Sequence, residues 1–148
     1  MKKTQPIKER LNSHRDMLEK LEALKVELEY TYGACKGSNF SGMPGGGGYK
    51  GTSEPEVLTD RITELKKKVS QKEDEIATNW DELEPLVEKL KPIETLIVNL
   101  RYRYGEEWDD VCFAVFGKRS DYLDEIDRYM NKMFKTHGRA LLELAEMI

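Results

Sequence analysis

A heptad pattern over residues 55–91 constrains the fold more than any other feature of this chain. Side chains recur there at alternating spacings of four and three residues: Leu58, Ile62, Leu65, Val69, Lys72, Ile76, Asn79, Leu83, Leu86 and Leu90. Because an α-helix turns once every 3.6 residues, this spacing places them along one stripe of a helix. Lys72 and Asn79 interrupt the stripe, as polar residues that set register in coiled coils do. The pattern predicts a long helix packed against another, with a kink at Pro85.

Residues 7–32 supply a second stripe. Its members are Ile7, Leu11, His14, Leu18, Leu21, Lys25, Leu28 and Tyr32. The intervening residues 33–53 are rich in Gly, Ser and Pro and include Gly45–Gly48, so they are predicted to be a flexible loop. Residues 1–91 are therefore predicted to form a long antiparallel helical hairpin. The second helix is the longer one, and its surplus apolar surface around Leu83, Leu86 and Leu90 would be covered by the rest of the chain or by a second subunit; we expect a homodimer.

Residues 92–148 are predicted to form a separate domain with a helix-turn-helix. A first helix over 92–104 begins at Pro92, where a missing N–H does no harm, and Gly105 caps its end. A second helix over 107–116 buries one face, and the turn that follows carries Lys118 and Arg119. Ser120 or Asp121 is expected to cap the last helix.

The last helix carries a basic face. At about 100° per residue, one side presents Arg128, Asn131, Lys132, Lys135 and Arg139. The opposite side presents Tyr129, Met133, Leu141 and Leu144. Cations neutralise phosphates, and Asn, Lys or Arg can bond base edges. Asn131, Lys132 and Lys135 are therefore expected in the DNA major groove, and Lys118, Arg119, Arg128 and Arg139 on phosphates. An ordinary amphipathic helix with a solvated face would show the same pattern.

These motifs resemble those of phage late-operon transcription regulators of the ArpU and RinA type and their uncharacterised phage relatives. The matching stretches are Leu100-Arg101-Tyr102 with Gly105 and Trp108, the run from Phe134 to Leu141, and the loop from Ser41 to Gly48. The C-terminal part of that family is similar to region 4 of sigma factors, which reads a promoter element. The resemblance implies an all-α transcription regulator that binds double-stranded DNA, with RNA polymerase or a sigma factor as a further partner, in the cytoplasm of a bacterial host.

The segment before the basic face departs from the family pattern. Residues 120–129 are acidic and longer than a minimal turn, and Asp124 would repel a phosphate. Met130 and Phe134 are apolar where a sigma-like recognition helix has polar residues. These features favour an alternative function, a protein-binding adapter that engages a host sigma factor or RNA polymerase without reading DNA. A third interpretation is a purely structural coiled-coil scaffold.

Composition and the remaining motifs exclude other classes. A net charge of −4 argues against a non-specific nucleic-acid coat, and no run of 18 apolar residues predicts a membrane span. The N-terminus lacks the apolar core of a signal peptide. Cys35 and Cys112 are far apart, as expected in a reducing cytosol. His14 and His137 have no zinc spacing, and no nucleophile motif is present, so no metal, cofactor or enzymatic activity is expected.

Overall fold

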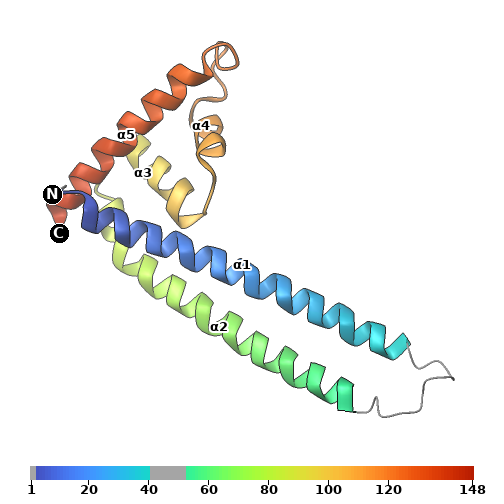
Figure 1. Ribbon diagram of the computed structural model, residues 1–148. Coiled ribbons are helices and arrows are strands. Elements are labelled where there is room, and N and C mark those ends of the chain that lie inside the picture. The colour runs from blue at the N-terminus through green and yellow to red at the C-terminus, as the bar shows by residue number, and fades with distance from the viewer. Residues whose placement is uncertain (1–2, 41–52) are drawn as a thin grey trace. The chain divides into compact units, whose positions relative to one another are not determined.

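The computed structural model describes residues 3–40 and 53–148, and every regular element in those ranges is helical (Figure 1). In chain order the elements are α1 (Gln5–Phe40), α2 (Ser53–Val87), α3 (Pro92–Val98), the π-helix η2 (Asn99–Arg103), α4 (Trp108–Phe116) and α5 (Ile126–Met147). The prediction of an all-α protein is confirmed for this part of the chain. The helices form two compact units: unit 1 contains Met1–Leu18 and Ile76–Ile148, and unit 2 contains Glu19–Glu75. These units differ from the division at residue 91 that the sequence suggests.

Unit 2 pairs the second part of α1 with the first part of α2 in antiparallel directions. Leu65 is fully buried at this seam, as the heptad pattern predicts. Lys25 Nζ lies 4.0 Å from Glu73 Oε2, and the Arg61 guanidinium pairs with Glu27. Exposed ion pairs of this kind stabilise little, so the apolar seam supplies most of the pairing energy.

The predicted loop begins too early in the chain. α1 continues from residue 33 to Phe40, and α2 begins at Ser53. The rest of the predicted loop, residues 41–52 with Gly45–Gly48, lies outside the described residues. α2 runs through Pro85 and ends at Val87 rather than near residue 91. Lys91 is extended (φ −64°, ψ 152°), as expected for a residue that precedes a proline.

Unit 1 joins the start of α1 and the end of α2 to the four C-terminal elements. One buried cluster contains Ile7, Leu11, Trp80, Leu83, Val87, Leu90, Val98, Tyr102, Ala140, Leu141 and Leu144. The apolar surface of Leu83 and Leu90, one basis for expecting a homodimer, is thus buried within unit 1. His14 is also fully buried, with Nδ1 2.8 Å from the Asn79 amide and its ring 5.0 Å from that of Trp80.

The chain turns sharply between the end of η2 and the start of α4. The helix predicted over 92–104 forms as α3 followed by η2, and the Glu106 N–H then bonds to the Leu100 carbonyl at 2.9 Å. Gly105 has a φ of +73°, so its predicted role as the cap is confirmed. A Cβ at Gly105 would lie 3.4 Å from Leu18 Cδ1.

The apolar content of the helices also bears on membranes. Within residues 3–40 and 53–148, none of the helices combines the length and the hydropathy required to span a bilayer.

Candidate nucleic-acid interface

α5 is held by a wide buried face. The buried residues of this helix are Tyr129, Met133, Thr136, Ala140, Leu141 and Leu144. Tyr129 and Met133 share a cluster with Ile97 from α3 and with three residues of α4, which are Val111, Cys112 and Phe116. Two neighbouring helices therefore fix the rotation of α5, and its opposite face is presented to solvent.

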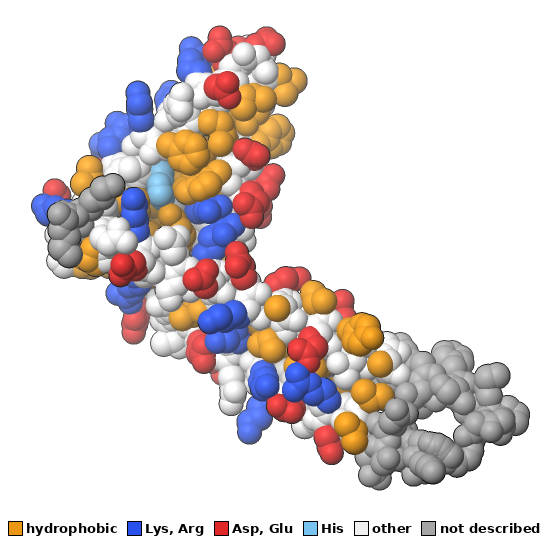
Figure 2. All heavy atoms as spheres, in the orientation of Figure 1, with side chains coloured by type: hydrophobic (Ala, Val, Ile, Leu, Met, Phe, Trp, Pro, Cys, Tyr) orange, Lys and Arg blue, Asp and Glu red, His pale blue; other side chains and the backbone are white. Residues whose placement is uncertain are grey.

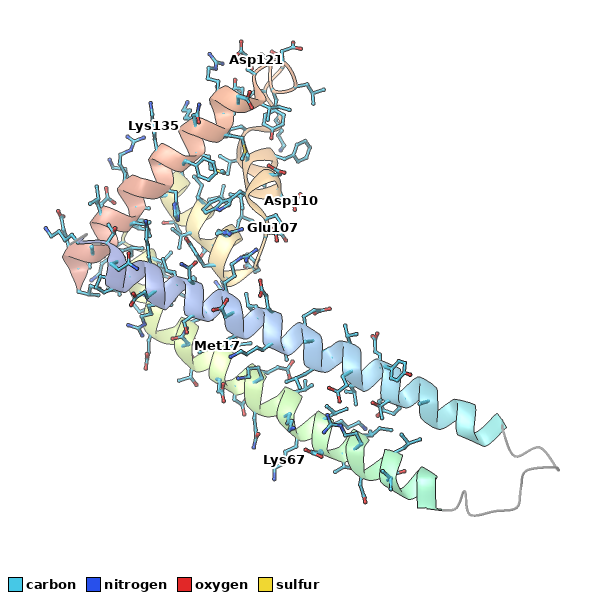
Figure 3. The ribbon with its side chains drawn as sticks, viewed as in Figure 1. Met17, Lys67, Glu107, Asp110, Asp121 and Lys135 are labelled. Atoms are coloured by element: carbon cyan, nitrogen blue, oxygen red, sulfur yellow. The ribbon has the colours of Figure 1, made fainter. Side chains whose placement is uncertain are left out.

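That opposite face carries the predicted basic residues. Arg128, Asn131, Lys132, Lys135 and Arg139 are all exposed, as are Lys118 and Arg119 in the preceding turn. Figure 2 shows Lys and Arg side chains along the outer edge of α5, and Figure 3 shows Lys135 pointing away from α4. The structure therefore brings the five α5 residues onto one continuous surface.

The cations of this surface are not equivalent. Arg128 Nη2 lies 3.0 Å from Asp121 Oδ2, and Arg128 Nε lies 3.8 Å from Glu125 Oε2. No ion pair within 4 Å joins Lys132 or Lys135 to an acidic side chain in the part of the chain that the structure describes. Lys132 and Lys135 therefore offer more available positive charge than Arg128.

The segment before α5 is an ordered turn that packs on the helices. The Tyr129 ring stacks between those of Phe116 and Tyr122, at centroid distances of 5.2 and 5.8 Å. Backbone bonds close the turn, including Tyr122 N–H to Arg119 O at 3.1 Å and Glu125 N–H to Asp121 O at 3.0 Å. The segment 120–129 is longer than a minimal turn because it includes Tyr122 and Tyr129, which form this aromatic stack.

The predicted cap of α5 is wrong. The helix begins after Glu125, which makes no side-chain capping bond, and neither Ser120 nor Asp121 occupies that position. Asp121 instead accepts a 2.5 Å hydrogen bond from the Tyr129 hydroxyl, and this bond lowers the pKa of its carboxyl group. The sequence signal that could have revealed this was the aromatic series Phe116, Tyr122 and Tyr129.

The apolar residues on α5 also have packing partners. Met130 is half-buried against the cluster that contains Tyr122 and Tyr129. Phe134 meets the Trp108 ring edge-on at 5.2 Å, and the Arg101 guanidinium lies 4.4 Å from the same indole. Met130 and Phe134 are apolar because they support α4 and the turn.

His137 has a packing role. Its Nε2 lies 2.8 Å from the Tyr102 hydroxyl, and its ring centroid lies 4.7 Å from that of Trp108. Burial, with smaller effects from Lys8 and Arg101, lowers the pKa of His137 to about 4. Among the described residues, no group of three or more His, Cys, Asp or Glu side chains could hold a metal ion.

The side of unit 1 away from the basic face is acidic. Asp109 and Asp110 on α4 are exposed, and Figure 3 shows Asp110 and Lys135 on opposite sides of the α4–α5 pair. Of these two surfaces, the α5 surface is the one that carries the cations needed to bind a polyanion.

Comparison with protein-family models, curated proteins and solved structures finds no match.

Proposed function

We propose that this protein is a phage-type transcription regulator that binds double-stranded DNA through α5, with α4, the turn and α5 acting as a helix-turn-helix. The observation that carries the proposal is the row of exposed cations on one face of a helix whose other face is anchored in a core. Fixed rotation matters because a helix that reads base edges must present the same side chains at each encounter.

The charge pattern indicates how α5 would lie on DNA. The B-DNA major groove, about 12 Å wide, admits a helix with its side chains. Asn131, Lys132 and Lys135 would enter it from the middle of α5, and Lys118, Arg119 and Arg139 would reach phosphates. The acidic residues of the turn before α5 would repel DNA phosphates close to the start of the helix. Contact through the second and third turns of α5 distinguishes this arrangement from a helix-turn-helix that reads bases with the first turn.

The test is DNA selection with the full chain at stated salt, followed by affinity measurements on variants. Lys135→Ala should weaken binding to the selected site by about 1–3 kcal/mol and weaken binding to random DNA less. Arg139→Ala should weaken both similarly and reduce the salt slope by about one. Lys67→Ala, which removes an exposed lysine from α2 in unit 2, is the matched control. The proposal fails if the chain binds no DNA at low salt, or if Lys67→Ala weakens binding as much as Lys135→Ala.

A second candidate function is favoured by exposed apolar side chains near the acidic residues. Phe113 on α4 is 62% exposed, and Leu123 in the turn is 82% exposed. Such side chains suit a protein partner better than DNA, so an adapter that binds a sigma factor or RNA polymerase is the alternative. If DNA selection fails, charge reversal of Lys132 and Lys135 should be tested for its effect on capture of the host sigma factor.

A further inference from the structure

Gly138 leaves a gap between the side chains of α5. It lies inside the helix, which runs from Ile126 to Met147, so no turn requires a glycine there. A Cβ at this position would have no heavy atom within 4 Å beyond the adjacent residues and the backbone of its own helix, so packing does not require a glycine either. A glycine inside a helix is destabilising relative to alanine, but it allows a ligand to approach the backbone closely.

The gap at Gly138 is bordered by both cations and apolar side chains. Residues three and four positions apart are neighbours on a helix surface. Lys135 precedes Gly138 by three positions and Arg139 follows it directly, and both are exposed. Phe134 and Leu142, four positions before and after Gly138, are exposed as well. A deoxyribose–phosphate strand matches these borders, because it offers phosphates to the cations and the carbon atoms of its sugars to the apolar side chains.

The start of α1 extends this surface beyond α5. Ile7 shares the first buried cluster of unit 1 with Leu141, so the start of α1 packs near the end of α5. Lys8 follows Ile7 directly and is half-buried. Its charge is one of the effects that lower the pKa of His137, the residue before Gly138, so its ammonium group lies near this part of α5. Figure 2 shows a histidine on the drawn face of unit 1, with Lys and Arg side chains on both sides of it.

The side chains one turn away from Lys8 on α1 do not neutralise it. They belong to Thr4, Leu11 and Asn12, none of which carries a charge. Arg128 differs in this respect, because its guanidinium is paired with acidic residues of the turn before α5.

We propose, on the basis of the DNA contact proposed above, that one DNA strand crosses α5 at Gly138 and that Lys8 of α1 binds a phosphate of the same strand. At 1.5 Å per residue, Gly138 lies about 10.5 Å along the helix from Asn131. The major groove is about 12 Å wide, so a helix that presents Asn131 to the bases meets the strand at the groove edge near Gly138. The missing side chain brings the phosphates closer to Lys135 and Arg139, and a shorter distance strengthens the attraction between charges.

Substitutions at residue 138 test the path of the strand without changing charge. Gly138→Ala and Gly138→Leu should keep or raise the midpoint of urea unfolding, because both residues favour helices over glycine. The Kd for the selected DNA should rise about threefold for Ala and at least about tenfold for Leu. The matched control is Gly33→Leu, at an exposed glycine of α1 in unit 2 whose added Cβ would also have no heavy atom within 4 Å. It should leave the Kd unchanged.

Substitution of Lys8 tests the phosphate contact. Lys8→Gln should raise the Kd for the selected site and for random DNA by similar factors and should lower the salt slope by about one. A purely structural role for Lys8 would leave the salt slope unchanged. Lys20→Gln, at an exposed lysine of α1 in unit 2, is the matched control.

Three results would overturn the proposed strand path: Gly138→Leu binds the selected DNA as tightly as the unsubstituted chain, Gly138→Ala lowers the urea midpoint, or Lys8→Gln leaves the salt slope unchanged. If Lys135→Ala weakens binding in the same measurements, the DNA contact through α5 stands even when the path across Gly138 is wrong. A chain that binds no DNA at low salt overturns both proposals.

Discussion

The Tyr129 hydroxyl donates a 2.5 Å hydrogen bond to Asp121 Oδ1, and Arg128 pairs with the other oxygen of the same carboxylate at 3.0 Å. One acidic side chain thus joins the turn to two consecutive residues of α5. The relationship explains why an acidic segment can precede a basic helix: part of its charge is used to hold the helix start in place.

Tyr129→Phe should lower the midpoint of urea unfolding at pH 7, because the hydrogen bond from Tyr129 to Asp121 is lost while the ring stack remains. The lowered pKa of Asp121 stabilises the fold above the unfolded-state pKa, and this contribution is lost as the pH falls through the folded-state pKa. The difference in urea midpoint between the unsubstituted protein and Tyr129→Phe should therefore become smaller as the pH is lowered. Tyr104→Phe, at a tyrosine that is 62% exposed, is the control and should change little.

Arg128→Ala should weaken DNA binding less than Lys132→Ala, although both residues were predicted to belong to the basic face. The Arg128 guanidinium is already paired with Asp121 and Glu125, whereas Lys132 has no such partner among the described residues. Affinity for the selected DNA at several salt concentrations measures the difference, and a steeper loss for Arg128→Ala would contradict it.

Acid should destabilise the protein through His137. Its folded-state pKa of about 4 lies below the ordinary value of 6.5, so the unfolded chain binds the additional proton between these values. Stability should be constant above about pH 6.5 and fall by on the order of 3 kcal/mol towards pH 4. Proton NMR titration of the two histidines and urea unfolding at each pH provide the measurements. His14, whose pKa is also lowered by burial, contributes with the same sign, and a His137 pKa near 6.5 would refute the prediction.

Asn79→Ala should cost about 1–3 kcal/mol, because it leaves the buried His14 Nδ1 without the amide that now donates to it at 2.8 Å. Asn12→Ala, at an exposed position on α1, is the matched control. Equal effects of the two substitutions on the urea midpoint would show that the His14–Asn79 bond is not a stabilising contact.

Periodic patterns predicted the helices well. Heptads placed Leu11 and Leu65 at buried seams, and the spacing from Trp108 to Val115 predicted α4 to within a residue at its start. Such patterns are local, because a helix repeats its geometry every few residues whatever it packs against.

The turn and the loop boundary could not be predicted in the same way. Asp121 has the chemistry of an N-cap, and only the position of Tyr129 in three dimensions shows that its carboxylate is used elsewhere. The glycine content of residues 33–40 favoured a loop, yet α1 continues through them, since helix propensity is a weak preference. The basic face was visible in the sequence, but the pairing of Arg128 depends on a turn whose path the sequence did not reveal.

The first buried cluster of unit 1 has a consequence for how the chain is made. It joins Ile7 and Leu11 to Leu141 and Leu144, so one side of the cluster is translated early and the other side is translated late. At roughly 5–20 residues per second, Ile7 and Leu11 wait on the order of ten seconds for α5 to be translated. During that interval Ile7 and Leu11 lack the α5 side chains that later cover them. Chaperones can bind this apolar surface only until α5 has been translated and has packed on it.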